Sequence, residues 1–310
     1  MTGRGVWPKG VLGGLLLGVA LAGRPVLAAP QPVTWRGQAM GAEATLILSH
    51  PDPARAAAIL RRVEAELRRL EGIFTLYRAE SELSQLNRTG ALAAPSPELV
   101  EALRLAQTAH EATGGRFDPT VQPLWRAYAT GADAGALTRA RSLVGFHRIT
   151  MGGDRVVLPR GMELTLNGIA QGYISDRIAA MLRAEGAVNT LVNMGEISAI
   201  CGRSATAPWR VGLSGGGEVE LADRALAVTE PSGFTFDAEG RLPHLIDPAS
   251  GAPRAEWRRV AVIAPQAGLA DALSTGLALA PAPVIRKAVG TLPGIQVRAL
   301  DAQGRESLFG

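Results

Sequence analysis

The chain has 310 residues, of which 47% are hydrophobic and 19% are charged, and its net charge is +4. This composition is that of a well-packed globular protein and excludes an intrinsically disordered chain. The single cysteine, Cys201, excludes an intramolecular disulfide, so the core has to supply the stability. Arginines such as Arg61 and Arg62 alternate with glutamates such as Glu64. This mixture is typical of a solvated helix face, so we expect no nucleic-acid partner.

Residues 1–29 have the pattern of a cleavable secretory signal. Arg4 and Lys9 supply a short positive region, an apolar run follows, and a small-x-small motif at 26–28 ends the segment. The apolar run is too short to span a bilayer comfortably. We therefore expect export to the periplasm and a mature chain of residues 30–310 that forms one compact domain.

The mature chain mixes helices and strands without a regular alternation. Ser or Asp followed by Pro predicts the start of two helices, and glycines predict where helices end. This mixture favours an α+β fold with mixed sheets and packed helices over a doubly wound sheet. The expected elements, in chain order, are a strand at 38–48, helices from 53 and from 97, a helix over about 170–185, a strand at 190–194, short β-like runs over 209–253, a helix over about 269–279, a short helix after Pro283 and a closing strand at 295–300.

A glycine-punctuated turn at residues 165–173 opens the third helix. Gly168 and Gly172 allow backbone groups to approach a ligand closely, and the free N–H groups at a helix start favour an anion. The turn is neither a G-x-G-x-x-G fingerprint nor a P-loop. By itself, such a turn is more often only a turn than a phosphate site.

Asp271 and Thr275 lie four residues apart in the predicted helix over 269–279. Their oxygens therefore project from adjacent turns of one face. That arrangement suits a hard cation such as Mg²⁺, which shares its ligands with substrate phosphates. The alternative is that Asp271 only complements the positive start of the helix. Ser274 points partly away from Asp271 and is a weaker candidate.

His244 stands just ahead of Asp247-Pro248 in a polar loop. A histidine in this setting can act as a general base near neutral pH. The structural alternative is an imidazole that hydrogen-bonds the loop backbone. His110, by contrast, lies at helical spacing from Leu103 and is expected to be a satisfied boundary residue.

Several motifs together resemble the ApbE family of FAD:protein FMN transferases, although each is loose singly. The resemblance runs from about residue 38 to about residue 279. The motifs are TLNGIAQGYISD at 165–176, VNMG at 192–195, HLIDPASGAP at 244–253 and ADALST at 270–275, with further matches at 40–41, 77, 81–87 and 115–120. Asn167, Gln171 and the EPSG of 230–233 look most like the NosX branch, which is associated with the maturation of a nitrous oxide reduction flavoprotein.

The resemblance implies that FMN moves from FAD to a Ser or Thr hydroxyl of a partner protein, with Mg²⁺ bound and AMP released. That partner would be a NosR-like, membrane-anchored flavoprotein. Carried over position by position, the family's Mg²⁺ contacts fall on the Gly168 carbonyl, Asp271 and Thr275, and His244 matches its proposed base. Its flavin and adenine contacts fall on Met40, Tyr77, Phe117, Asp118, Thr165, Gln171 and Leu245.

Two positions depart from the usual family text. Thr165 stands where the family usually has Asp, and Gln171 stands where it often has Lys or Glu. Loss of the Asp removes a charged contact to the nucleotide, which would alter affinity for FAD. These departures keep open a periplasmic FAD carrier that transfers nothing. A further alternative is a hydrolase of the FAD diphosphate, with water in place of the protein hydroxyl.

Overall fold

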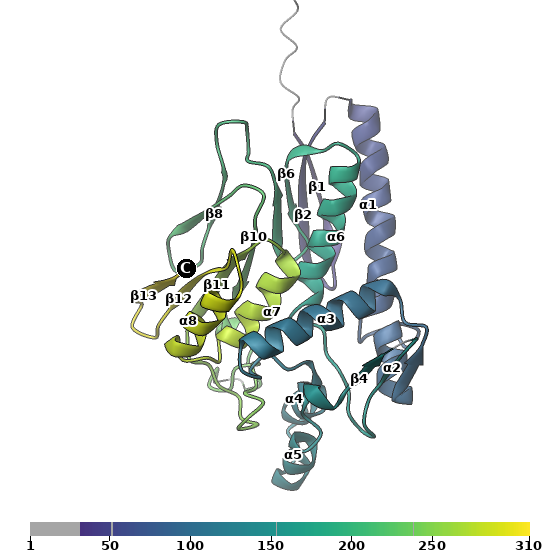
Figure 1. Ribbon diagram of the computed structural model, residues 1–310, viewed down its shortest axis with the longest axis vertical. Helices are drawn as coiled ribbons and strands as arrows, with labels where there is room; N and C mark the ends of the chain where they lie inside the picture. Colours follow the sequence, from purple (N-terminus) through teal and green to yellow (C-terminus); the bar gives the residue numbers. More distant parts are fainter. Residues whose placement is uncertain (1–31, 51, 153, 238) are drawn as a thin grey trace, which may run out of the picture.

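The structure is a computed structural model that describes residues 32–50, 52–152, 154–237 and 239–310. Its centre is an eight-stranded sheet in the order β1-β2-β6-β7-β10-β11-β12-β13 (Figure 1). These strands are β1 (Val33–Ala39), β2 (Ala42–Ser49), β6 (Val188–Asn193), β7 (Ile197–Ile200), β10 (Ala225–Thr229), β11 (Arg259–Ala264), β12 (Gln296–Leu300) and β13 (Glu306–Phe309). The expected signal at residues 1–29 lies outside the described residues.

Helices cover one face of this sheet, and α3 crosses below α7 in the view of Figure 1. The helices are α1 (Pro53–Phe74), α2 (Glu82–Thr89), α3 (Pro97–Ala112), α4 (Gln122–Ala129), α5 (Ala134–Arg141), α6 (Ala170–Ala184), α7 (Ala267–Leu277) and α8 (Ala282–Thr291). Of these, α1, α6, α7 and α8 pack on the large sheet, whereas α4 and α5 lie below it in Figure 1. The small strands are β3 (Ala91–Ala93), β4 (Thr150–Gly152) and β5 (Arg155–Val157), which form one sheet, and β8 (Trp209–Gly212) and β9 (Glu218–Leu221), which form a hairpin. The predicted α+β class is confirmed.

The helix starts follow from local side-chain chemistry. Asp52 accepts hydrogen bonds from the N–H groups of Ala54 and Arg55 and so caps α1, and Ser96 caps α3 through the N–H of Leu99. Such caps satisfy N–H groups that have no partner within the helix. The predicted helices from 53 and from 97 begin at these caps. The helices predicted over 170–185 and over 269–279 are also present, although their own N-cap residues form no side-chain cap.

Three predictions about the strands were wrong. The segment 38–48 is not one strand, because Met40 and Gly41 both have positive φ, 51° and 81°, and turn the chain into the β1–β2 hairpin. The expected mixed sheets are instead antiparallel at each described strand pair. In the large sheet, short turns join β1 to β2, β6 to β7 and β12 to β13, and the other pairs bring together strands that are distant in the chain. The closing strand at 295–300 is also followed by β13.

The central strands are buried on both faces. In β11, Val260 and Val262 contribute to the main core beneath the helices, whereas Ala261 and Ile263 contribute to a second cluster with the β8–β9 hairpin. This split follows from the two-residue period of a strand. The sheet therefore has a side-chain layer on each face, one beneath the helices and one beneath the β8–β9 hairpin. The candidate site is lined by residues from both layers.

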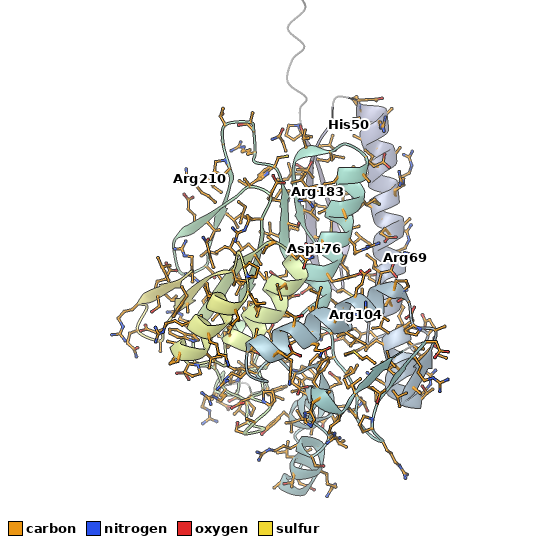
Figure 2. All side chains as sticks on the ribbon, in the orientation of Figure 1. His50, Arg69, Arg104, Asp176, Arg183 and Arg210 are labelled. Carbon is orange, nitrogen blue, oxygen red and sulfur yellow. The ribbon has the colours of Figure 1, made fainter. Side chains whose placement is uncertain are left out.

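Three arginines of α1 pair with acidic side chains: Arg55, Arg62 and Arg69. Arg62 forms an ion pair with Glu185, and Arg69, labelled in Figure 2, pairs with Glu66 and Glu98. These contacts agree with the predicted solvated face, where mixed charges compensate one another. Within the described ranges, each helix is too short or too polar to cross a membrane.

Candidate functional site

One cavity of about 930 Å³ lies between the start of α6, one face of α7 and the loops around Phe117 and His244. This volume is at the upper end of the roughly 300–1,000 Å³ typical of small-molecule sites. All of the predicted site residues except Met40 line it: Tyr77, Phe117, Asp118, Thr165, Gly168, Gln171, His244, Leu245, Asp271 and Thr275. The structure thus brings together residues that are up to about 200 positions apart in the sequence.

Exposure separates the floor of the cavity from its mouth. Phe117, Leu245 and Asp271 are buried and form part of the floor. Tyr77 and Phe234 are 87% and 52% exposed although they also line the cavity. These two side chains therefore mark the mouth, where a second reactant can enter.

Two glycines hold α6 against α7 at the floor. A Cβ on Gly172 would lie 2.3 Å from the carbonyl oxygen of Ala267, and a Cβ on Gly268 would lie 3.2 Å from the N of Tyr173. Each helix therefore offers a glycine where the other backbone approaches. The helix pair is fixed backbone to backbone, so side chains on either helix have a defined separation.

The carboxyl group of Asp176 also joins the two helices. It lies on α6 (Figure 2) and accepts hydrogen bonds from the N–H groups of Ala267 and Gly268, at 2.8 and 2.9 Å. Burial raises the pKa of Asp176 to about 6, although these two N–H groups lower it. Asp176 therefore caps α7. This is the role that the alternative interpretation of the sequence assigned to Asp271.

Gly168 and Thr275 are in close contact at the start of α6. A Cβ on Gly168 would lie 2.9 Å from Oγ1 of Thr275 and 3.3 Å from the ring of Phe117. The absence of this Cβ lets the turn backbone approach the α7 face that carries Thr275. Gly168 and Thr275, two of the predicted metal-binding residues, are consequently neighbours.

Asp271 is buried on α7 and points to the start of α6. Its Oδ2 accepts the N–H of Gly172 at 3.1 Å, so this N–H is not free to bind an anion as the sequence suggested. Burial raises the pKa of Asp271 to about 7, with the charge of Asp176 adding to the shift and the Gly172 N–H opposing it. Ser274 is turned away, because its Oγ contacts Thr229 at 2.6 Å.

A second acidic group, Glu196, lines the cavity near Asp271. Its Oε2 accepts the N–H of Val228 at 3.2 Å. Burial raises the pKa of Glu196 well above its usual range, and the charge of Asp271 adds to the shift. Neither carboxyl group forms a salt bridge with another described residue. Two buried acids without a basic partner are unfavourable as anions, and a cation between them would relieve this.

The donor set at this point fits Mg²⁺ chemically. Mg²⁺ takes oxygen ligands and is commonly held by one or two carboxylates together with substrate phosphates. Asp271, Thr275 and the Gly168 backbone supply a carboxylate, a hydroxyl and a carbonyl at one wall of the cavity. Among the described residues, no group of three His, Cys, Asp or Glu side chains is suited to hold a metal alone, so phosphate oxygens would have to complete the shell.

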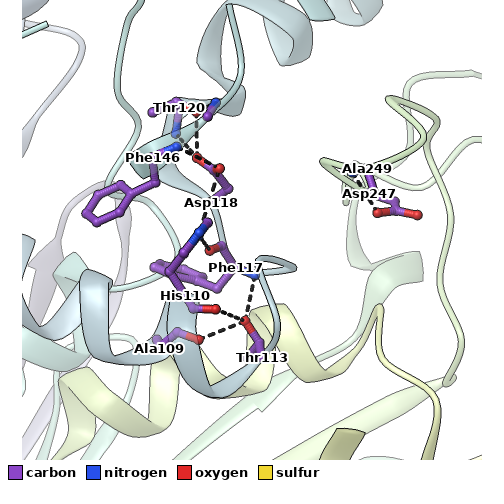
Figure 3. Close-up of polar contacts among 10 residues, drawn as sticks. Ala109, His110, Thr113, Phe117, Asp118, Thr120, Phe146, Asp247 and Ala249 are labelled. Carbon is purple, nitrogen blue, oxygen red and sulfur yellow. Dashed lines mark hydrogen bonds and ion pairs between the residues drawn. The ribbon is translucent and has the colours of Figure 1, made fainter. Parts of the chain in front are cut away.

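Asp118 lines the cavity but uses its carboxylate to fix the surrounding loop (Figure 3). Oδ1 accepts the N–H of Thr120 at 2.9 Å, and Oδ2 accepts the N–H of Phe146 at 3.0 Å. Nδ1 of His110 contacts the carbonyl of Phe117 at 2.9 Å, which confirms His110 as a satisfied boundary residue. Both oxygens of Asp118 are therefore already used within the loop, and its carboxylate has little free charge to offer a ligand.

His244 makes the backbone contact that one interpretation of its sequence predicted, whereas its role as a general base stays a prediction. Its Nδ1 lies 3.0 Å from the carbonyl oxygen of Phe234, so the imidazole does hydrogen-bond the loop backbone. Because a carbonyl can only accept, Nδ1 carries the proton in this contact, and the lone pair of the neutral ring lies on Nε2. His244 also lines the cavity, where a free Nε2 can accept a proton.

The loop after His244 is held by Asp247, which appears at the right of Figure 3. Its Oδ1 accepts the N–H of Ala249 at 3.0 Å, and its Oδ2 accepts from Ser250 at 3.1 Å and from Arg254 at 3.3 Å. A carboxylate that accepts hydrogen bonds from its own loop forms a rigid turn. Asp247 therefore positions the segment that carries His244 and Leu245.

Met40 lies in the β1–β2 turn, and its N–H donates to Glu71 at 2.8 Å. Glu71 also pairs with Arg78, next to Tyr77, so the turn sits beside the mouth without being part of the cavity wall. The wall residues that sequence reasoning missed include Glu196, Trp125 and Phe234. Glu196 follows the strand motif at 192–195 directly, which could have identified it, whereas nothing local distinguishes the two aromatic residues.

Fold and site together define an α+β protein with a nucleotide-sized cavity, an acidic floor suited to a cation and a histidine near the mouth. The model of the ApbE family matches residues 40–298, and the chain belongs to this family. Relatives named FAD:protein FMN transferase include those of Salmonella typhimurium, 26% identical with 85% of this chain and 83% of that protein covered, and of Treponema pallidum, 28% identical with 74% and 73% covered.

Solved structures agree with this assignment. The flavinyl transferase ApbE of Pseudomonas stutzeri, in its apo form, is 25% identical with a TM-score of 0.79 and covers 91% of this chain and 96% of its own. The apbe protein of Thermotoga maritima has the same fold at 23% identity, with a TM-score of 0.78 and coverages of 90% and 97%. The predicted enzyme class, a flavin transferase, is confirmed by the names that these relatives carry.

Proposed function

We propose that this protein transfers FMN from FAD to a Ser or Thr hydroxyl of a target protein and releases AMP. The acceptor oxygen bonds to the phosphorus of the FMN half, the bond between that phosphorus and the bridging oxygen breaks, and AMP leaves with the bridging oxygen. The hydroxyl proton passes to a base. The observation that carries the proposal is a single cavity that holds His244 together with Asp271 and Thr275.

His244 is the base in this proposal. The contact of Nδ1 with the Phe234 carbonyl orients the ring and leaves Nε2 to accept the hydroxyl proton. A positioned base of this kind typically contributes about 10²–10⁴-fold to a rate. The hydrogen bond between Nδ1 and the loop would therefore support catalysis, since it selects the tautomer that can act as base.

Asp271, Thr275 and the Gly168 carbonyl would hold Mg²⁺, which when bound neutralises phosphate charge and orients the diphosphate. The chain's own contribution is to bring these oxygens together through the glycine contacts of α6 with α7. Burial raises the pKa of both Asp271 and Glu196, and a bound cation would stabilise their charged forms. FAD would place its phosphates against this floor.

The surroundings of the nucleotide would be neutral at two positions where charge is common in the family. Thr165 Oγ1 accepts the N–H of Asn167 at 3.3 Å, and Gln171 lies beneath Gly195, where a Cβ would come within 2.5 Å of its amide. Both side chains line the cavity and can contact a nucleotide by hydrogen bonds. We expect these contacts to set the affinity for FAD rather than the transfer step.

The setting proposed for this activity is the periplasm, after export by the signal at residues 1–29. The NosX-like text at Asn167, Gln171 and 230–233 favours a NosR-like target, a membrane-anchored flavoprotein with a periplasmic acceptor domain. This assignment rests on the sequence resemblance. It predicts that the protein is needed wherever that flavoprotein matures.

The test combines the mature protein, FAD, Mg²⁺ and the purified periplasmic domain of a NosR-like flavoprotein. Flavin fluorescence that stays on the target after denaturing electrophoresis, with one AMP released per label, is the expected result. Tight FAD binding without label or AMP would support a carrier instead. Free FMN formed in the absence of any target would support a diphosphate hydrolase.

A further inference from the structure

The hairpin that carries His244 presents an exposed aromatic surface at the cavity mouth. The backbone of this hairpin is paired by the N–H of His244 to the carbonyl of Phe234, at 3.1 Å, and by the N–H of Phe236 to the carbonyl of Leu242, at 2.8 Å. Residues paired across two antiparallel strands point to the same side, as do residues two apart. Phe234, Phe236, Leu242 and His244 therefore share one face.

Aromatic contacts join this face to α4. The ring of Phe234 stacks on Trp125 with 6.1 Å between centroids and 21° between planes, and Phe236 meets Trp125 edge-on at 5.4 Å. We call the rings of Trp125, Phe234 and Phe236 the aromatic shelf. Its outer member, Phe234, also lies edge-on to His244 at 6.2 Å, so the shelf reaches the candidate base.

The shelf exposes apolar surface where a monomeric enzyme has no structural need for it. The large hydrophobic side chains exposed in the described part of the chain are Tyr77, Val188, Phe234, Leu242 and Leu308. Two of these belong to the short hairpin that carries the base. Contiguous exposed apolar groups are typical of binding surfaces, and rigid aromatic side chains are favoured anchors in them.

We propose that the aromatic shelf docks the chain segment of the acceptor protein that flanks its reactive Ser or Thr, an inference that rests on the proposed function. FAD on the acidic floor leaves the mouth as the route to the phosphorus. A hydroxyl that reaches Nε2 of His244 from the mouth brings its own backbone beside Phe234. The segment that fits is therefore extended and carries an apolar side chain near the acceptor hydroxyl.

Flavin is the competing occupant of the shelf, since aromatic rings also stack on isoalloxazine. Trp125 and Phe234 both line the cavity, so either the flavin ring or the acceptor segment can contact them. Leu242, however, is 40% exposed and does not line the cavity, so the apolar face extends past the space that FAD would fill. This extension favours a macromolecular occupant over the flavin ring.

The experiment measures the effect of Phe234→Ala on two constants, KM for the NosR-like periplasmic domain and Kd for FAD by quenching of flavin fluorescence. We expect KM to rise about tenfold, as for loss of an interface anchor, with the FAD Kd changed less than about threefold. Phe234→Leu should restore part of the loss. Leu308→Ala, at another exposed apolar site, on β13, is the control and should leave KM unchanged.

An unchanged KM in Phe234→Ala, or an FAD Kd that rises in step with KM, would overturn the docking inference. So would self-association of the wild-type protein in sedimentation experiments that Phe234→Ala abolishes, because the shelf would then serve a second copy of the chain. Failure of the wild-type protein to label the acceptor contradicts the proposed function instead. In the same assay, the Phe234→Ala variant therefore tests the docking inference and the wild-type protein tests the proposed function.

Discussion

The floor and the mouth of the cavity are built by different physical means. At the floor, α6 and α7 meet through glycines, and a methyl group on Gly172 would overlap the backbone of Ala267. At the mouth, His244 is held by one carbonyl contact and by aromatic rings that remain partly exposed. The floor therefore fixes positions by close packing, whereas the mouth fixes one ring by a hydrogen bond and leaves apolar surface free.

This difference assigns different consequences to substitutions. Changes at the floor should affect folding and metal chemistry together, because the same backbone contact supports both. Changes at the mouth should affect the transfer step or the acceptor while the fold persists. Four predictions, in order of decreasing effect, test this division.

Asp271→Ala should lower Mg²⁺-dependent transfer by about 10³-fold, the effect of losing a group that stabilises charge in the reacting complex. Turnover with FAD and acceptor, measured across Mg²⁺ concentrations, tests this. Ser274→Ala is the control, because Ser274 is a neighbour on α7 that bonds to Thr229 rather than facing the cavity. Unchanged turnover in Asp271→Ala would exclude Asp271 as a metal ligand.

Gly172→Ala should destabilise the protein by about 3 kcal/mol, because the added methyl group can be accommodated only if the α6–α7 backbones separate. Urea unfolding followed by circular dichroism gives this value. Gly72→Ala is the matched control, since its Cβ would meet nothing within 4 Å and alanine is favoured within α1 by up to about 1 kcal/mol. Equal stability of the two variants would contradict the tight helix contact.

His244→Ala should reduce the transfer rate at saturating substrates by about 10²-fold, as expected for loss of a general base. The FAD Kd should stay within about threefold of the wild-type value, since the floor is untouched. His147→Ala, at an exposed position away from the cavity wall, should have neither effect. Equal losses of rate and of FAD affinity would argue for a binding role for His244 instead.

Asp176 gives the floor a pH dependence. Its pKa is raised to about 6 in the folded protein from an ordinary value of about 3.9, so the folded state binds the proton more tightly. The stabilisation by this group is then complete below about pH 4 and is lost as the pH rises through 6. Between pH 4 and pH 7, the stability of the wild type relative to Asp176→Asn should fall by about 2 kcal/mol, because solvent screening reduces the full effect at a half-buried side chain.

Urea unfolding of both proteins at several pH values measures this difference. The expected curve slopes downward with pH for the wild type relative to the variant. An opposite slope, with Asp176 more stabilising at high pH, would mean that the N–H groups of Ala267 and Gly268 outweigh burial. The capping role of Asp176 would stand in either case, but its pKa would then lie below the ordinary value.

Local signals in the sequence were sufficient for elements with caps or stops. Asp52-Pro53 and Ser96-Pro97 marked α1 and α3, because a capping side chain acts within three residues. The same reasoning missed the turn at Met40, since positive φ at a non-glycine residue has little signature in a single sequence. It also missed the antiparallel pairing, which depends on distant strands.

For the site, the i, i+4 spacing of Asp271 and Thr275 and the polar loop of His244 were enough to identify groups that are chemically able to act. How these groups are used depends on contacts between distant segments. The tertiary structure assigned helix capping to Asp176, brought Glu196 beside Asp271 and placed Phe234 at the mouth. The reason is physical: spacing along a helix is a local property, whereas burial, pKa and the shape of a cavity arise from contacts between segments that are remote in the chain.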